Sequence, residues 1–224
     1  ISVLLKRTRP GHSVFHYRFT DKPAVPQPGR SAFERGVYDR ASSEFRVGSL
    51  KFPIRAAYGL PEFDSLSYGS ELVMRVLQSL PESVVQQAAI FNPGQGHLAV
   101  AVWKLIRPDR IVLIDRDLLA LRFSQLNLSL NECPDEKIVL SHQSGLALTD
   151  EAETDLFVIR LREESRDVNN VVVKQASEKL SKKGVILVSA SSTATTRLVG
   201  DLEGSLRVRS RERWRGNSVL VLVK

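Results

Sequence analysis

The chain has 224 residues, of which 42% are hydrophobic and 25% are charged, as is normal for a soluble globular protein. This length suits one domain of ordinary size with an extension. No window approaches the roughly 18 apolar residues of a transmembrane helix, and the single cysteine excludes an internal disulfide and a cysteine-rich metal site. We therefore expect a cytoplasmic protein without a metal site and without membrane contact.

The net charge of +7 is unevenly distributed, because residues 1–55 hold 11 Lys/Arg and 4 Asp/Glu while the remainder is neutral. A basic arm on a neutral domain is typical of proteins that bind nucleic acid; a solvated extension without a partner is the alternative. Residues 1–47 show no sustained periodicity, and the proline-rich stretch 22–30 is typical of a linker. We expect a basic N-terminal extension or linker over 1–48 and a folded domain over 49–224.

The folded domain begins with an expected strand at 49–56 and a helix from Gly69 to Leu80. Strands and helices then alternate: strands are expected at 88–92, 110–115, 137–141, 155–161 and 184–189, and helices at 97–106, 117–131, 167–181 and 191–202. Two final strands, 205–214 and 218–223, are joined by Gly216-Asn217. This order predicts an α/β fold with a doubly wound, mostly parallel sheet and an antiparallel last strand.

The stretch 88–115 is a strand, a glycine turn, a helix and a strand. Gly94 and Gly96 let the backbone approach a ligand closely, and the following helix points N–H groups towards it. Asp115 follows Gly94 by 21 positions, close to the roughly 20 expected of an acid that binds ribose hydroxyls. We predict a nucleoside-containing cofactor here; a purely structural turn, with Asp115 facing solvent or pairing with Arg116, is the alternative. His97 is expected to be partly exposed.

Five arginines alternate with other residues near the C-terminus: Arg207, Arg209, Arg211, Arg213 and Arg215. On a regular strand all five would share one face. RNA phosphate would suit such a face, because arginine binds phosphate bidentately. The alternative is an edge strand whose charge prevents aggregation.

Four segments carry a family resemblance. LSYGSEL at 66–72 is similar to an L-D-x-G-S-x-L entry segment, and IFNPGQGHL at 90–98 lies at a D-x-G-x-G-x-G-x-L motif. Residues 112–131 and 154–158 are similar to the V-D-x-S-x-x-A…N-L-x-x-N run and to the F-D-L-I-V strand. The chain thus resembles the class I S-adenosylmethionine-dependent methyltransferases, in particular the small-domain family that includes ribosomal RNA guanine methyltransferases acting on the exocyclic amine.

The resemblance implies S-adenosylmethionine as cofactor and ribosomal or other RNA as partner. It assigns the cofactor to seven residues: Asn92, Gly94, Gln95, Gly96, Asp115, Arg116 and Gln143. His142 and Gln143 follow the third strand of the alternating series, where the family recognises the adenine ring.

The chain departs from the family pattern after the strand at 155–161. The family's N-P-P-F tetrapeptide accepts hydrogen bonds from the target amine and stacks on the base, but this chain has Arg160, Leu161, Arg162 and Glu163. Arginine only donates hydrogen bonds, so no catalytic residue is assigned. A second interpretation is therefore a domain that binds RNA or cofactor without methyl transfer. A third is a nicotinamide enzyme, because Gly94, Gly96, Ala99 and Asp115 also satisfy the dinucleotide fingerprint.

Overall fold

The computed structural model describes residues 2–9, 12–18, 31–146, 153–161, 166–202 and 206–224. These residues form two compact units, 1–37 and 38–224. In the first unit, β1 (Ser2–Arg9) and β2 (His12–Arg18) pair as an antiparallel hairpin. The sequence predicted no strands before residue 49, which was wrong for this hairpin; a bulge between Val3 and Leu5 interrupts its alternation.

The second unit is built on a seven-stranded sheet in the order β10-β11-β9-β8-β5-β6-β7. The strands run β5 (Gln87–Phe91), β6 (Arg110–Asp115), β7 (Ile138–His142), β8 (Thr154–Arg160), β9 (Leu180–Ser191), β10 (Arg207–Trp214) and β11 (Asn217–Val223). β5, β6, β7, β8 and β9 are parallel, whereas β11 is antiparallel to β9 and β10. The predicted doubly wound sheet with an antiparallel last strand is confirmed.

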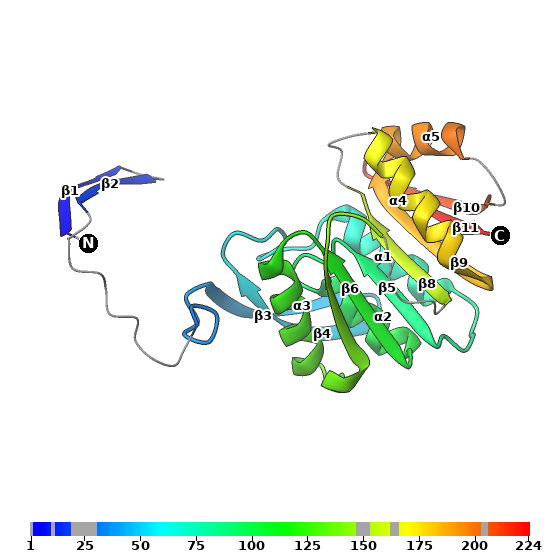
Figure 1. Cartoon of the computed structure of the whole chain (residues 1–224), viewed down its shortest axis with the longest axis horizontal. Coiled ribbons are helices and arrows are strands. Elements are labelled where there is room, and N and C mark those ends of the chain that lie inside the picture. The colour runs from blue at the N-terminus through cyan, green and yellow to red at the C-terminus, as the bar shows by residue number, and fades with distance from the viewer. Residues whose placement is uncertain (1, 10–11, 19–30, 147–152, 162–165, 203–205) are drawn as a thin grey trace. The chain divides into compact units, whose positions relative to one another are not determined.

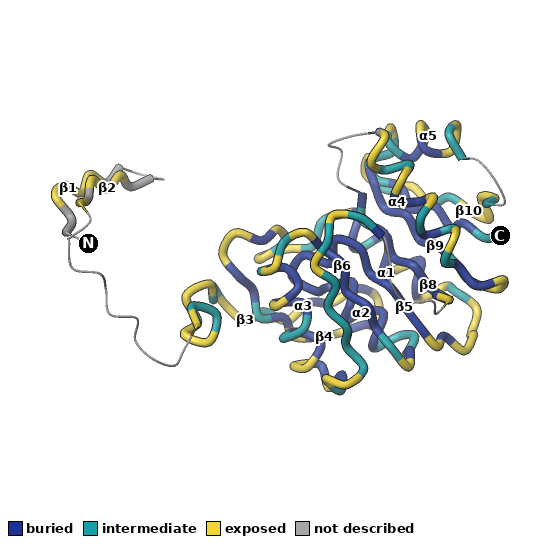
Figure 2. Tube along the Cα trace, in the orientation of Figure 1, coloured by how far each residue is buried: buried dark blue, intermediate teal, exposed yellow. Residues whose placement is uncertain are grey.

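Helices cover both faces of this sheet (Figure 1). One hydrophobic core joins α1 (Tyr68–Ser79), α2 (His97–Ile106) and α3 (Leu118–Leu130) to one face, and another joins α4 (Arg166–Lys179) and α5 (Ser192–Asp201) to the other. A 3₁₀ turn, Asp135–Lys137, precedes β7. The central strands are buried along their length (Figure 2), which is why segments such as 111–114 are continuously apolar.

A further hairpin, β3 (Asp39–Val47) and β4 (Leu50–Ala57), adds its apolar side chains to the core of α1, α2 and α3. The sequence predicted only the second of these strands. The sequence did not indicate β3 because the strand lacks a regular apolar alternation. Its middle, residues 42–44, is largely exposed, and only Phe45 and Val47 are buried. Since β3 pairs with β4, the compact unit begins at Tyr38, before the boundary expected at residue 49.

The outer edge of β4 is hydrogen-bonded by amide side chains instead of by another strand. Gln95 and Asn127 each accept from and donate to one β4 residue, at Ala57 and Arg55 respectively. Asn131 donates to the carbonyl of Pro53, but its own oxygen is buried without a hydrogen-bond partner among the described residues. Proline has no N–H to offer it. We call these three side chains the amide ladder; they attach the hairpin to α3 and to the turn before α2.

Candidate functional site

The glycine turn, residues 92–96, lies where the strand order reverses, because β5 has β6 on one side and β8 on the other. Open α/β sheets bind ligands at this position. Gly96 has φ 94°, and an added Cβ would lie 2.8 Å from Ser124 Cα, so only glycine allows the turn to approach α3 this closely. Gly94 has φ 59°, and among the described residues a Cβ added to it would lie near Arg160 Nη1 at 3.7 Å and Pro61 Cγ at 3.8 Å.

Side chains beneath the turn hold its carbonyl groups away from the ligand side. Ser124 Oγ donates to the Gly94 carbonyl, and Asn127 donates to the Gln95 carbonyl. The Gln95 side chain is fully buried in the amide ladder, so only its main chain can face a cofactor. The N-cap of α2 is Gly96, which provides no side-chain cap, so the first N–H groups of the helix suit an electronegative ligand atom.

Asp115 and Gln143 lie together at the ends of β6 and β7. Asp115 is fully buried and its Oδ1 accepts from Asp117 N at 3.0 Å, while Gln143 N donates to the Asp115 carbonyl. The Gln143 side-chain nitrogen is buried and has no hydrogen-bond partner among the described residues. A buried acceptor beside a donor that lacks an acceptor suits ribose hydroxyls and a ring nitrogen of adenine. These residues therefore fit the nucleoside half of S-adenosylmethionine.

Arg116 and His142, which the sequence also placed near this site, are arranged differently. Arg116 is exposed, and its carbonyl lies 2.9 Å from His142 Nε2. The structure thus brings Asp115, Gln143 and the main chain of the glycine turn to one place, while the Gln95 side chain points into the amide ladder.

An ion pair occupies the position of the missing tetrapeptide. Arg160 Nη1 donates to Glu62 Oε2 at 2.8 Å, and the Glu62 side chain is only 6% exposed. The other Glu62 oxygen accepts from the backbone of Ser67, the N-cap of α1, and Asn92 Nδ2 donates to the Arg160 carbonyl. The entry segment, β8 and the glycine turn are thereby fastened together. Leu161 is buried, and Arg162 and Glu163 lie outside the described residues.

Sequence reasoning missed Glu62 because no motif contains it. The signal that would have found it is Arg160 itself, since a partly buried arginine needs an anionic partner. Burial alone would raise the pKa of Glu62, but Arg160 and the hydrogen bond from Ser67 hold that pKa below its usual value. We infer that the pair is charged at neutral pH.

His97 is 1% exposed, so the expectation that it is partly exposed was wrong. The β3–β4 hairpin covers the first turn of α2, and the His97 ring packs edge-on against Phe45 with centroids 4.6 Å apart. Burial lowers the pKa of His97 to about 4, with Glu62 acting in the opposite direction from 4.0 Å away. His97 is therefore neutral at physiological pH.

The five C-terminal arginines do not share one face, contrary to the prediction. A bulge between Val208 and Ser210 shifts the alternation of β10. Arg211 turns to α5, where it donates to the Ser192 carbonyl and to two threonine hydroxyls. Arg215 has φ 45° and forms the hairpin turn with Gly216, one residue before the predicted turn.

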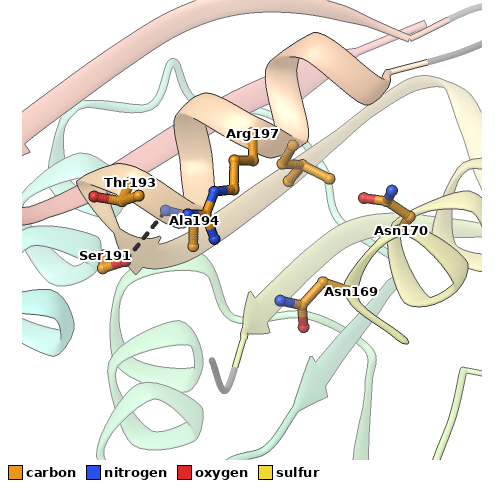
Figure 3. Close-up of a pocket in the computed structure, with 7 residues that line it drawn as sticks. Asn169, Asn170, Ser191, Thr193, Ala194 and Arg197 are labelled. Atoms are coloured by element: carbon orange, nitrogen blue, oxygen red, sulfur yellow. Dashed lines mark hydrogen bonds between the residues drawn. The ribbon is translucent and has the colours of Figure 1, made fainter. Parts of the chain in front are cut away.

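A hollow of about 410 Å³ opens between α4 and α5 at the carboxyl end of β9 (Figure 3). Two strand spacings, about 10 Å, separate β9 from β5. Among the described residues the hollow is lined by Asn169, Asn170, Ser191, Thr193, Ala194, Arg197 and Leu198. Asn169 and Arg197 come to it from different helices, and the volume lies within the usual range of small-molecule sites.

Two classes of site find no support in the described part of the chain. Its His, Cys, Asp and Glu side chains form no group of three that could hold a metal ion. None of its helices is both long enough and apolar enough to span a membrane.

Residues 54–212 match the sequence profile of the methyltransferase small domain. The chain belongs to the methyltransferase small-domain family. This family depends on S-adenosylmethionine, the cofactor that the sequence predicted. Among curated protein sequences, none matches the chain.

Solved structures of other methyltransferases share the fold. The T. thermophilus 16S rRNA N2 G1207 methyltransferase (RsmC), in complex with S-adenosylmethionine and guanosine, aligns with a TM-score of 0.70 at 20% identity, over 98% of this chain and 57% of its own. Ribosomal protein L11 methylase from Lactobacillus delbrueckii subsp. bulgaricus aligns with a TM-score of 0.59 at 19% identity, over 70% and 78%. Precorrin-6y C5,15-methyltransferase from Geobacter metallireducens aligns at 0.53 and 14%, over 75% and 92%.

The names of these three proteins indicate an RNA, a protein and a small molecule as acceptors. At such identities the likeness establishes the fold and leaves the acceptor open. The chain spans little more than half of the T. thermophilus enzyme.

Proposed function

We propose that this methyltransferase-family chain transfers a methyl group from S-adenosylmethionine to an RNA base. The observation that carries the proposal is the position of buried Asp115 next to Gln143, whose side-chain nitrogen finds no acceptor among the described residues, beside the glycine turn. The RNA acceptor is supported by the +7 charge held in residues 1–55. The structural likeness to a 16S rRNA methyltransferase supports it further.

Each cofactor residue has a distinct role in this proposal. Asp115 accepts hydrogen bonds from the ribose hydroxyls, and the Gln143 amide donates to the adenine ring. Gly94 and Gly96 allow the backbone to approach closely. S-adenosylmethionine, when bound, supplies a methyl group that its sulfonium already activates. The protein then contributes position and orientation, which do not require an acid–base pair.

The acceptor base is assigned to the hollow between α4 and α5. Its place at the carboxyl end of β9 puts it on the same edge of the sheet as the glycine turn. Asn169 lines the hollow and carries an amide oxygen, so it is able to accept a hydrogen bond from an exocyclic amine, which Arg160 is not. We assign this accepting role to Asn169.

A second candidate function is binding without catalysis, and the Arg160–Glu62 pair favours it. The pair places a guanidinium group over Gly94, at the family position of a hydrogen-bond acceptor. In this alternative the chain keeps the nucleoside half of the site and binds cofactor and RNA without methyl transfer.

Two measurements on the full chain separate these functions. Calorimetry with S-adenosylmethionine and with NAD identifies the cofactor, and transfer of a radiolabelled methyl group to ribosomal RNA reports catalysis. We expect S-adenosylmethionine binding and transfer in the wild type, and loss of transfer with unchanged cofactor affinity in Asn169→Ala. Cofactor binding without transfer, with activity gained in Arg160→Asn, would establish the second candidate. Binding of NAD alone would reject both.

A further inference from the structure

Two aromatic rings and two arginines gather where α1 begins and β10 ends. The Tyr68 and Trp214 rings meet edge to face with centroids 5.0 Å apart. The Arg215 guanidinium lies 4.7 Å from the Tyr68 ring centroid and donates to the Tyr68 hydroxyl at 2.7 Å. The Arg75 guanidinium lies 4.8 Å from the Trp214 centroid. We call these four residues the stacking platform.

The platform lies on the same edge of the sheet as the glycine turn. β11 begins at Asn217, which pairs with Ser191 at the carboxyl end of β9. Gly69, next to Tyr68, lies so close to this edge that an added Cβ would be 3.2 Å from both Asn217 Oδ1 and Ser189 Oγ. Three strand spacings, about 14 Å, separate β5 from β11. One continuous polymer ligand can therefore reach the platform and the cofactor site together.

Tyr68 gives the platform its solvent-facing ring, whereas Trp214 is partly buried and packs against the hydrophobic core. Tyr68 is 41% exposed, whereas Trp103 is 5% exposed and its indole nitrogen donates to the Asn131 carbonyl inside the core. Arg215 is also exposed and takes a positive φ, where asparagine or glycine costs less. Packing alone does not explain the exposed Tyr68 ring or the arginine in the turn.

We propose that the stacking platform binds a single-stranded segment of RNA. Unpaired bases stack on the exposed Tyr68 ring, and Arg215 neutralises a neighbouring phosphate. Arg75, which pairs with Glu71, lies over the Trp214 ring. Bases in a duplex already stack on one another, so the platform prefers single strands. The inference rests on the RNA acceptor of the proposed function and names a docking surface for it outside the hollow between α4 and α5.

The test uses the full chain and a fluorescein-labelled RNA oligomer without secondary structure, followed by anisotropy across a salt series. Tyr68→Ala removes one ring at a helix position that tolerates alanine, and we expect about tenfold weaker binding with an unchanged salt slope. Arg215→Asn creates an Asn-Gly turn, which is favoured in hairpins, so the variant should fold at least as well as the wild type. We expect it to weaken binding and to reduce the salt slope by about 0.7.

Matched controls separate the platform from general effects. Tyr58→Ala removes a tyrosine outside the platform that is even more exposed, at 59%, and should leave affinity unchanged. Tyr68→Phe keeps the ring and should retain most of the binding. Trp214 fluorescence should be quenched by the oligomer, while the signal of buried Trp103 stays constant.

Three outcomes would overturn the inference: a wild type without affinity for the oligomer, equal affinity in wild type and Tyr68→Ala, or equal affinity for duplex RNA. Calorimetry with S-adenosylmethionine on the same variants keeps the two proposals apart. Failure of the cofactor to bind the wild type rejects the proposed function. If the cofactor binds but the wild type and the platform variants bind RNA equally well, only the platform is rejected.

Discussion

The two sides of the glycine turn differ in how far they keep the family pattern. On the β6 and β7 side lie the buried Asp115 carboxylate and the Gln143 amide, which is the combination predicted to bind a nucleoside. On the β8 side, the acceptor residue has become an arginine that pairs with Glu62. Since the two sides are built on different strands, one can change while the other is kept. We therefore expect cofactor binding and acceptor chemistry to be separable properties of this sheet.

The largest effect is expected from Gly96→Ala, which tests the support shared by both sides. The new Cβ would meet Ser124 Cα at 2.8 Å, and the positive φ adds strain, so the free energy of unfolding should fall by about 3 kcal/mol or more. Gly94→Ala is the matched control, with a positive φ but contacts no closer than 3.7 Å, and should cost about 1–2 kcal/mol. Denaturant unfolding measures both; equal losses would contradict the close approach of the turn to α3.

A smaller effect, on binding alone, is expected from Asp115→Asn. Asparagine keeps the oxygen that accepts from Asp117 N but removes the charge, so affinity for S-adenosylmethionine should fall by about 1.5–3 kcal/mol. Arg160→Asn, on the opposite side of the turn, should not weaken the cofactor. Calorimetry on both variants tests whether the two sides are separable; equal losses would show that they act as one unit.

Acid should destabilise the cluster of Glu62, Arg160 and His97. The pKa of His97 is lowered to about 4 in the folded chain, compared with about 6.5 when unfolded. Between these values the unfolded chain takes up a proton that the native chain does not, so stability falls as pH falls, by on the order of 2 kcal/mol. The lowered pKa of Glu62 acts in the same direction at lower pH.

Urea unfolding from pH 7 to pH 4 measures this dependence. His97→Phe keeps an aromatic ring against Phe45 and removes the titrating group. The variant should lose the slope between about pH 6.5 and 4. A slope that persists unchanged would assign the effect to other groups.

The smallest effect is expected at Cys133, away from both sides of the turn. Burial raises the pKa of its thiol to about 11, so the reactive thiolate is scarce at pH 8. A thiol reagent should label the folded chain very slowly and the urea-unfolded chain quickly. Rapid labelling of the folded chain would show that the segment after α3 opens locally.

The elements that the sequence predicted correctly have residues at both ends that typically begin or end a helix or strand. The helix expected at 97–106 has these bounds in the structure, because Gly96 precedes it and Pro108 follows it closely. The parallel strands were recognisable because both of their faces are buried. The antiparallel last strand followed from a short turn, although the turn itself proved to be Arg215-Gly216.

The features that escaped prediction depend on contacts between distant segments. Glu62 and Arg160 lie 98 positions apart, so no local pattern connects them. The bulge in β10 could not be recognised from the sequence, because the arginines alternate with other residues throughout the strand. Gln95 lies in the glycine turn, where the sequence predicts a cofactor residue. Its side chain is buried because it forms hydrogen bonds with Ala57 of β4, a contact that the local sequence does not reveal. The assignment of site residues therefore stays a prediction for Asp115 and Gln143.

The amide ladder has a consequence for how the protein behaves at high concentration. An open strand edge is a template on which another chain can pair and aggregate. Asn127 and Gln95 occupy both hydrogen-bonding groups of their β4 residues, and Pro53 offers no donor. A second copy therefore cannot pair with β4 from Pro53 to Ala57. Colloidal stability of the unit consequently depends on side chains that also support the glycine turn.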